Sequence, residues 1–118
     1  MHHVDLFKTF AAAGGAQIPT DRTLDGVDLL PYLKGEVTGA PHQTLFWREG
    51  YHQSVRHGDW KLIHYYEDGR DELYNLAADP GERHDQAPAH PPTAGQLRGR
   101  LDRWLEKVGA RLPVPDPE

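Results

Sequence analysis

The sequence predicts an α+β fold: a short N-terminal helix and linker, then an antiparallel sheet of about four strands packed against a C-terminal amphipathic helix. Three observations indicate this fold. Aromatic and branched residues form short runs between residues 44 and 76, turn residues separate these runs, and leucines recur at helical spacing after residue 93. A sheet this small needs a covering helix for independent stability, which the last segment supplies.

The composition narrows the class of protein. The chain has 118 residues, 37% of them hydrophobic, with twelve glycines and ten prolines, which suits a turn-rich chain with a modest core. Thirteen basic and eighteen acidic residues leave a formal charge of −5, which argues against nucleic acid as a partner. Cysteine is absent, so disulfides, thiolate metal sites and a cysteine nucleophile are excluded.

Neither a membrane span nor a leader is expected in this sequence. No apolar run approaches the ~20 residues that cross a bilayer, so we expect no membrane partner. Met1 is followed by an amphipathic stretch rather than a long apolar region, so we expect no signal peptide here. The compartment stays unassigned.

The first expected helix covers residues 4–14, VDLFKTFAAAG, where apolar residues recur at helical spacing. Asp5 is the expected N-cap, and Gly14 or Gly15 the C-terminal stop. Almost nothing precedes this segment that could pack against it.

A second, shorter helix is expected within LDGVDLLPYLKGE, after the polar link QIPTDRT. Asp28 can cap one to two turns that run to Leu33, and Gly35 ends them. Pro31 is tolerated because it lies in the first turn. EVTGAPHQ, residues 36–43, then reads as a linker.

Four runs have the composition of strands, and WKLIHYY is the strongest of them. The predicted strands are residues 44–49, 51–57, 60–66 and 71–76. Gly69 allows a hairpin turn before the last strand. Asp79-Pro80-Gly81-Glu82 fits a type I or type II turn after it.

The last predicted element is an amphipathic helix over residues 93–109. Thr93 and Gln96 form a capping-box pattern, and Gly109 ends the helix. The apolar stripe consists of Leu97, Leu101, Trp104, Leu105 and Val108. We expect this stripe to pack on one face of the sheet.

Six segments occur in a specific order: HVDLF, LDGVDLLPYLKGE, LFWREG, VRHGDWKLI, ELYNLAADPGE and the final Leu/Trp helix. Together they resemble the C-terminal portion of sulfatases, of the arylsulfatase and N-sulphoglucosamine sulphohydrolase type. The resemblance runs from His3 to Leu105. Lys8 stands where the family usually has a proline, and lysine is a good helix former.

The resemblance implies a division of the chain. Residues 1–35 would correspond to the end of the family's large α/β domain. Residues 36–118 would correspond to its C-terminal subdomain, with the sheet at 44–76 and the helix at 93–109. That subdomain supports an active site built elsewhere in the parent chain.

The catalytic groups that the family uses have no counterpart in these 118 residues. Its nucleophile is a formylglycine made from Cys or Ser in a C/S-x-P-x-R motif, whereas Ser54, the only serine, lies in SVRHG. The family's calcium ligands and its sulfate-binding Lys and His belong to upstream segments. We therefore expect no catalytic residue, no metal ligand and no cofactor in this chain, and calcium and formylglycine only in an upstream domain.

The first hairpin holds the candidate binding residues Trp47, Arg48 and His52. Cationic and hydrogen-bonding groups suit a sulfated, anionic substrate, so these residues are predicted to contribute to the substrate rim in a full-length relative. The alternative is that Arg48 and Arg56 pair with carboxylates on a solvated sheet face. The carboxylates in question are those of Glu49, Asp59 and Glu67.

Histidines and acidic residues have simpler interpretations. Three histidines are scattered through the strands and are expected at the surface: His52, His57 and His64. The alternative is that a hairpin brings His52 and His57 together as part of a metal site. The acidic residues at the turns are expected there for conformational reasons. They are Asp59, Glu67, Asp68, Asp71 and Glu72.

Two of the three tryptophans have a structural interpretation. Trp60 and Trp104 are expected to be core anchors. Trp60 could alternatively stack on a sugar.

Two functions remain open on the sequence. The first is a C-terminal sulfatase subdomain that is inactive by itself, whether it comes from a gene fragment, a late start or a split protein. Its partner would be an upstream sulfatase catalytic domain, or a second copy bound through helix 4–14, which would expose Phe7 and Phe10. The second is a free-standing module that binds a sulfated glycan or a protein.

Overall fold

A computed structural model describes residues 2–111 of the chain. These residues form two compact units, which divide between Gln43 and Thr44. The first unit is mostly irregular and holds two short helices, and the second holds a sheet and a long helix. The end of the predicted second part, residues 112–118, lies outside the described residues.

The first helix, α1, spans Asp5–Ala13, within one residue of the expectation at either end. Gly15 adopts a φ of 67° just after it, as expected of a glycine stop. The expected cap is wrong: Val4 occupies the N-cap position, and Asp5 is the first helical residue. The Asp5 carboxylate instead accepts the backbone N–H of His2 at 2.7 Å.

The second helix, α2, spans Leu30–Leu33 and has Pro31 in its first turn, as predicted. The expected cap is wrong here too, because Leu29 and not Asp28 occupies the N-cap position. The Asp28 carboxylate still accepts the backbone N–H of Leu30 at 2.9 Å. Contacts link α1 and α2 within this unit.

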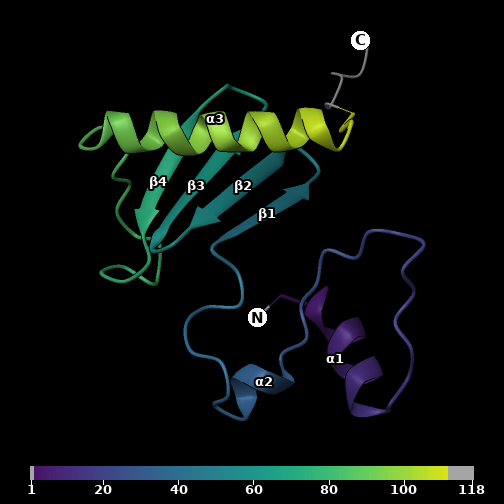
Figure 1. Ribbon diagram of the computed structural model, residues 1–118. Helices are drawn as coiled ribbons and strands as arrows, with labels where there is room; N and C mark the ends of the chain where they lie inside the picture. The colour runs from purple at the N-terminus through teal and green to yellow at the C-terminus, as the bar shows by residue number, and fades with distance from the viewer. Residues whose placement is uncertain (1, 112–118) are drawn as a thin grey trace. The chain divides into compact units, whose positions relative to one another are not determined.

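The second unit contains a four-stranded sheet in which neighbouring strands in sequence are neighbours in space (Figure 1). The strands are β1 (Thr44–Glu49), β2 (His52–His57), β3 (Trp60–Tyr65) and β4 (Asp71–Asn75). All three pairings are antiparallel. The predicted meander is therefore confirmed, with strand ends that differ by at most one residue.

The connections between strands follow the turn chemistry of the sequence. Gly69 has a φ of 69° in the β3–β4 hairpin, where a side chain would be strained. After β4, the N–H of Glu82 donates to the carbonyl of Asp79 at 3.2 Å and closes the expected turn. Gly81 does not take a positive φ, which excludes type II, and Glu82 takes one of 52° instead.

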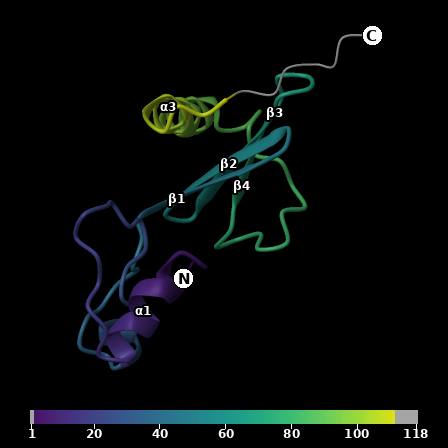
Figure 2. The same cartoon turned by 90° about the vertical axis from the view of Figure 1, so that its right-hand side faces the viewer.

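Helix α3 spans Pro91–Lys107 and covers one face of the sheet (Figures 1 and 2). The predicted capping box is wrong, because the helix begins two residues earlier and has no side-chain hydrogen bond at its N-cap, His90. Proline already has the φ of a first helical residue, and its missing N–H needs no partner there. At the other end Gly109 has a φ of 59°, as expected for the stop.

The core lies between α3 and the sheet. It consists of Val55, Leu62, Leu73, Leu97, Leu101 and Leu105. Trp60 and Trp104 pack against this cluster, which confirms their expected structural role. The Trp104 ring stacks on that of Phe46, with centroids 4.9 Å apart and planes within 2°.

No helix within residues 2–111 is long and apolar enough to span a membrane.

Strand alternation gives the sheet two faces of different character. On the helix face, Val55 is paired with Leu62, and Leu62 with Leu73. We call the opposite side the outer face. It carries Trp47, Glu49 and His52 from the first hairpin and Tyr65 and Glu72 from the last.

Candidate functional site

The three predicted rim residues do not share one face of the sheet. Trp47 and His52 lie on the outer face, where the His52 ring meets the Tyr65 ring edge-on at 4.8 Å. Arg48 is paired with the buried Gln53, so it lies on the helix face, where its guanidinium donates to the backbone carbonyl of Arg111. The structure thus places two of the three on one face of the sheet, and a role in substrate binding stays a prediction.

The expected ion pairs of the first hairpin are wrong within residues 2–111. Arg48 bonds to a backbone carbonyl, and the Arg56 Nε donates to the carbonyl of Gly58 at 3.0 Å. Neither guanidinium forms an ion pair with a carboxylate in the part of the chain that the structure describes. Their charges are therefore not neutralised by the sheet.

The strand histidines do not converge. His52 and His57 are five residues apart on β2 and so point to opposite faces, and the His57 Nδ1 lies 2.7 Å from the Thr44 hydroxyl oxygen. His64, expected at the surface, is only 5% exposed. Within residues 2–111 no group of three His, Asp or Glu residues is placed to hold a metal ion.

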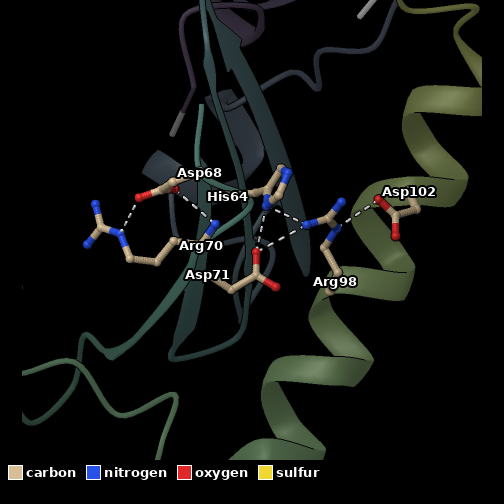
Figure 3. Close-up of polar contacts among 6 residues, drawn as sticks. All are labelled: His64, Asp68, Arg70, Asp71, Arg98 and Asp102. Atoms are coloured by element: carbon tan, nitrogen blue, oxygen red, sulfur yellow. Dashed lines mark hydrogen bonds and ion pairs between the residues drawn. The ribbon is translucent and has the colours of Figure 1, made fainter. Parts of the chain in front are cut away.

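His64 belongs to a polar network that joins the sheet to α3 (Figure 3). Its Nδ1 lies 2.8 Å from the Asp71 carboxylate of β4 and also contacts the Arg98 guanidinium. Arg98 forms ion pairs with Asp71 at 3.2 Å and with Asp102 at 2.9 Å. Strand alternation places His64 on the same face as Leu62. The burial of that position becomes visible only in the structure, where α3 covers this face.

The one guanidinium of this network is already engaged by carboxylates. Burial alone would lower the pKa of Arg98, but Asp102 and Asp71 outweigh it and raise that pKa. Arg98 therefore stays charged and is engaged by two carboxylates, so it is a poor receptor for an anionic ligand. The arrangement fastens the helix to the sheet.

The outer face has a second cluster, centred on Glu72. Its carboxylate accepts the hydroxyls of Tyr65 at 2.9 Å and Tyr74 at 2.8 Å, and it pairs with Arg70. The Arg70 guanidinium also lies 4.3 Å over the Tyr65 ring. Burial and the Glu72 carboxylate raise the pKa of both tyrosines, so neither hydroxyl is a base or a nucleophile near neutral pH.

Two further features of the second unit are a buried glutamine and a depression. The Gln53 side chain is 1% exposed, and neither its oxygen nor its nitrogen has a hydrogen-bond partner among the described residues. A depression of about 290 Å³ lies beside the end of α3. It is lined by Tyr66, Asp102, Leu105, Glu106, Gly109 and Ala110. Its two carboxylates would repel a sulfated ligand.

The first unit has a polar centre that the sequence did not indicate. Asp5 is fully buried, and its carboxylate accepts the N–H of Val27 at 3.0 Å and lies 2.7 Å from the His42 Nε2. Burial alone would raise the pKa of Asp5, but these bonds and that from His2 lower it to about 2. The hydrogen bonds of this carboxylate hold α1 to the loop that follows it.

The chain is similar to known sulfatases over most of its length. No family model matches it. Mouse (Mus musculus) steryl-sulfatase is 29% identical over 96% of this chain and 23% of its own. A Formosa agariphila sulfatase is 32% identical over 93% of this chain and 24% of its own.

Solved structures show the same relationship. A 2-O GAG sulfatase superposes with a TM-score of 0.73 at 28% identity, over 90% of this chain and 25% of its own. A putative sulfatase from Bacteroides thetaiotaomicron gives 0.74 at 26% identity, over 95% and 27%. The chain thus spans about a quarter of the length of the relatives it matches.

Proposed function

Because this chain is a homologue of the C-terminal portion of sulfatases, we propose that it serves as the C-terminal subdomain of an enzyme that hydrolyses sulfate esters or sulfamates. The observation that carries this is the extent of the match: nearly the whole chain, but about a quarter of each relative. The sheet and α3 would form a rigid support beside an active site, and that site would lie in the remaining three quarters of the enzyme's chain.

The chain's own residues do not fit the family's cofactors. A formylglycine needs Cys or Ser in C/S-x-P-x-R, and the one serine, Ser54, is followed by Val-Arg-His. Calcium needs six or more oxygen ligands, and residues 2–111 hold no suitable cluster. The nucleophile and the metal site are therefore assigned to the remainder of the enzyme.

A chimera tests this function. The chain would replace the matching portion of the Bacteroides thetaiotaomicron Delta 4,5-hexuronate-2-O-sulfatase, a relative of 29% identity. We expect the chain alone to give no turnover, and the chimera to hydrolyse the relative's sulfated substrate above the level of that relative truncated before the match. A folded chimera no more active than the truncated enzyme would refute the proposal.

Within this function, the first hairpin is proposed to form part of the substrate rim. Arg48 and His52 are exposed, and Arg48 has no carboxylate partner among the described residues, which suits a sulfate group. Arg48→Ala in the chimera should raise KM several-fold with little change in kcat, whereas the exposed α3 residue Arg100, changed to Ala, should leave both unchanged. An unchanged KM for Arg48→Ala would remove it from the rim.

A free-standing sulfated-glycan module is the second candidate. It is favoured by two exposed guanidinium groups of the first hairpin, Arg48 on the helix face and Arg56 on the outer face, which pair with no carboxylate among the described residues. Calorimetric titration with a heparin-type oligosaccharide would detect such binding. No heat at millimolar ligand would exclude this candidate and leave the first.

A further inference from the structure

Strand β4 is an edge of the sheet, and the chain itself covers that edge. The connection from β4 to α3 runs along the free side of the strand (Figure 1), and we call residues 83–90 of this connection the β4 strap. In an antiparallel edge strand, alternate residues direct their backbone N–H and C=O groups away from the sheet. The register with β3 makes Leu73 the central residue of β4 that points outward in this way.

The β4 strap imitates a paired strand at Leu73. The N–H of Gln86 donates to the carbonyl of Leu73 at 2.7 Å, as the N–H of a neighbouring strand would. The N–H of Leu73 donates to the carboxylate of Asp85 at 2.9 Å, so a side-chain oxygen stands where a strand would present a carbonyl. The same Asp85 oxygen accepts the N–H of Ala87 at 2.8 Å. One carboxylate therefore holds the strap in shape and fastens it to β4.

This fastening is small and accessible to solvent. Asp85 is an exposed residue, so water competes for its carboxylate. The start of the β4 strap is anchored separately, because the Asp79 carboxylate accepts the N–H of Arg83 at 2.8 Å and that of His84 at 2.9 Å. Release of the strap from Leu73 breaks neither of these bonds.

The edge that the strap covers is complementary to itself. Two copies of β4, DELYN, can pair antiparallel about Leu73, which then faces its own copy. The flanking pairs in that register are Glu72 with Tyr74 and Asp71 with Asn75. Each carboxylate thus lies opposite a hydrogen-bond donor, and Glu72 already accepts the Tyr74 hydroxyl within one chain at 2.8 Å. Sliding the register by two residues would place Glu72 opposite Glu72, and such like-charge pairs are destabilising.

We propose that the β4 strap is an autoinhibitory cover of a strand-addition edge, and that the partner of this edge is a second copy of the chain. Pairing about a two-fold axis closes at the dimer and joins the two sheets edge to edge. A strand of another sequence would meet Asp71 and Glu72 without the matched donors that Asn75 and Tyr74 supply. The inference does not use the proposed function, because it concerns this chain by itself.

Sedimentation velocity of the full chain tests the proposal with three variants. Asp85→Ala removes the acceptor, and Asp85→Asn is the matched control because it keeps a carbonyl oxygen there. The double variant Asp85→Ala/Asn75→Asp places a carboxylate opposite Asp71 of the second copy. Aspartate can also accept the N–H groups of Ala77 and Ala78 that the Asn75 side chain now accepts, so the turn after β4 is preserved. Thermal unfolding shows whether each variant is folded.

We expect the wild type and Asp85→Asn to associate to the same extent. Asp85→Ala should lower the dimer dissociation constant at least ~10-fold, because the strap loses its bond from a charged acceptor to β4. The added Asn75→Asp change should return that constant to the wild-type value. Four results would overturn the proposal: no added dimer in Asp85→Ala, an equal gain in Asp85→Asn, a dimer that Asn75→Asp does not weaken, or assembly beyond the dimer.

Hydrogen exchange of the wild type gives an independent check, and it decides the matter if Asp85→Ala does not fold. The Leu73 amide should exchange through local release of the strap, at a rate that low urea concentrations leave unchanged. The amide of Leu62, in the interior strand β3, should exchange only through global unfolding. If Leu73 exchanges only together with Leu62, the strap is not released separately and the proposal fails.

Discussion

Arg98 of α3 and Asp71 of β4 form an ion pair with an N–O distance of 3.2 Å, and Asp71 in turn lies 2.8 Å from the buried His64. This contact links α3 directly to β4. Both partners of this ion pair are partly buried, because the Arg98 and Asp71 side chains are each 29% exposed. The interface between helix and sheet is therefore partly polar.

The first prediction concerns this ion pair. Arg98→Ala should lower the free energy of unfolding by about 1–3 kcal/mol, because Asp71 loses its cation next to a buried imidazole. Urea unfolding followed by tryptophan fluorescence measures the change. Arg100→Ala is the control, since Arg100 is exposed on the same helix, and equal effects of the two changes would contradict the role of Arg98.

The second prediction concerns the core. Leu101 is fully buried against the sheet, so Leu101→Ala should lower the free energy of unfolding by about 2–5 kcal/mol through lost burial and a cavity. Val108→Ala, at an exposed position of the same segment, should cost less than about 0.5 kcal/mol. The same urea titration measures both, and a loss below 1 kcal/mol at Leu101 would argue that α3 packs elsewhere.

The third prediction concerns the pH dependence of the first unit. The pKa of Asp5 falls from 3.8 to about 2 on folding, so its carboxylate contributes stability that is fully present above pH 3.8. That contribution, about 2 kcal/mol, is lost as the pH falls through about 2. Backbone NMR signals of α1 should therefore weaken between about pH 4 and pH 2.

Asp5→Asn provides the matching variant. It should destabilise α1 at neutral pH and remove most of this acid dependence, whereas Asp25→Asn, at an exposed position, should leave the titration unchanged. An acid transition that persists in full with Asn at position 5 would show that another group causes it.

The fourth prediction uses two glycines in opposite settings. A Cβ at Gly26 would lie 2.0 Å from the carbonyl oxygen of Val4, whereas a Cβ at Gly95 meets nothing within 4 Å. Gly26→Ala should therefore disrupt the first unit, because backbone atoms must move. Gly95→Ala in α3 should raise the free energy of unfolding by about 0.5–1 kcal/mol through helix propensity. NMR of α1 and urea unfolding distinguish these effects, and a neutral Gly26→Ala would contradict the close approach.

Local chemistry was predictable where neighbours in sequence decide the conformation. The strands, the Gly69 hairpin and the leucine stripe of α3 all followed from short-range patterns, because alternation, turn residues and helical spacing act within a few positions. The start of α3 was predicted less well. A plausible Thr93 capping box competed with a Pro-Pro pair that begins the helix at Pro91, and both signals are local.

The sequence by itself determined the order and type of the elements, the absence of a thiol or formylglycine motif, and the resemblance to sulfatases. Only the tertiary structure decided which polar groups are buried. Asp5 and His64 look like surface residues in the sequence, because a carboxylate or imidazole enters the interior only where partners distant in the chain supply its hydrogen bonds. The outward position of Phe7 and Phe10 follows from the same cause: the inner side of α1 was already taken by the bonds of Asp5, Lys8 and Thr9.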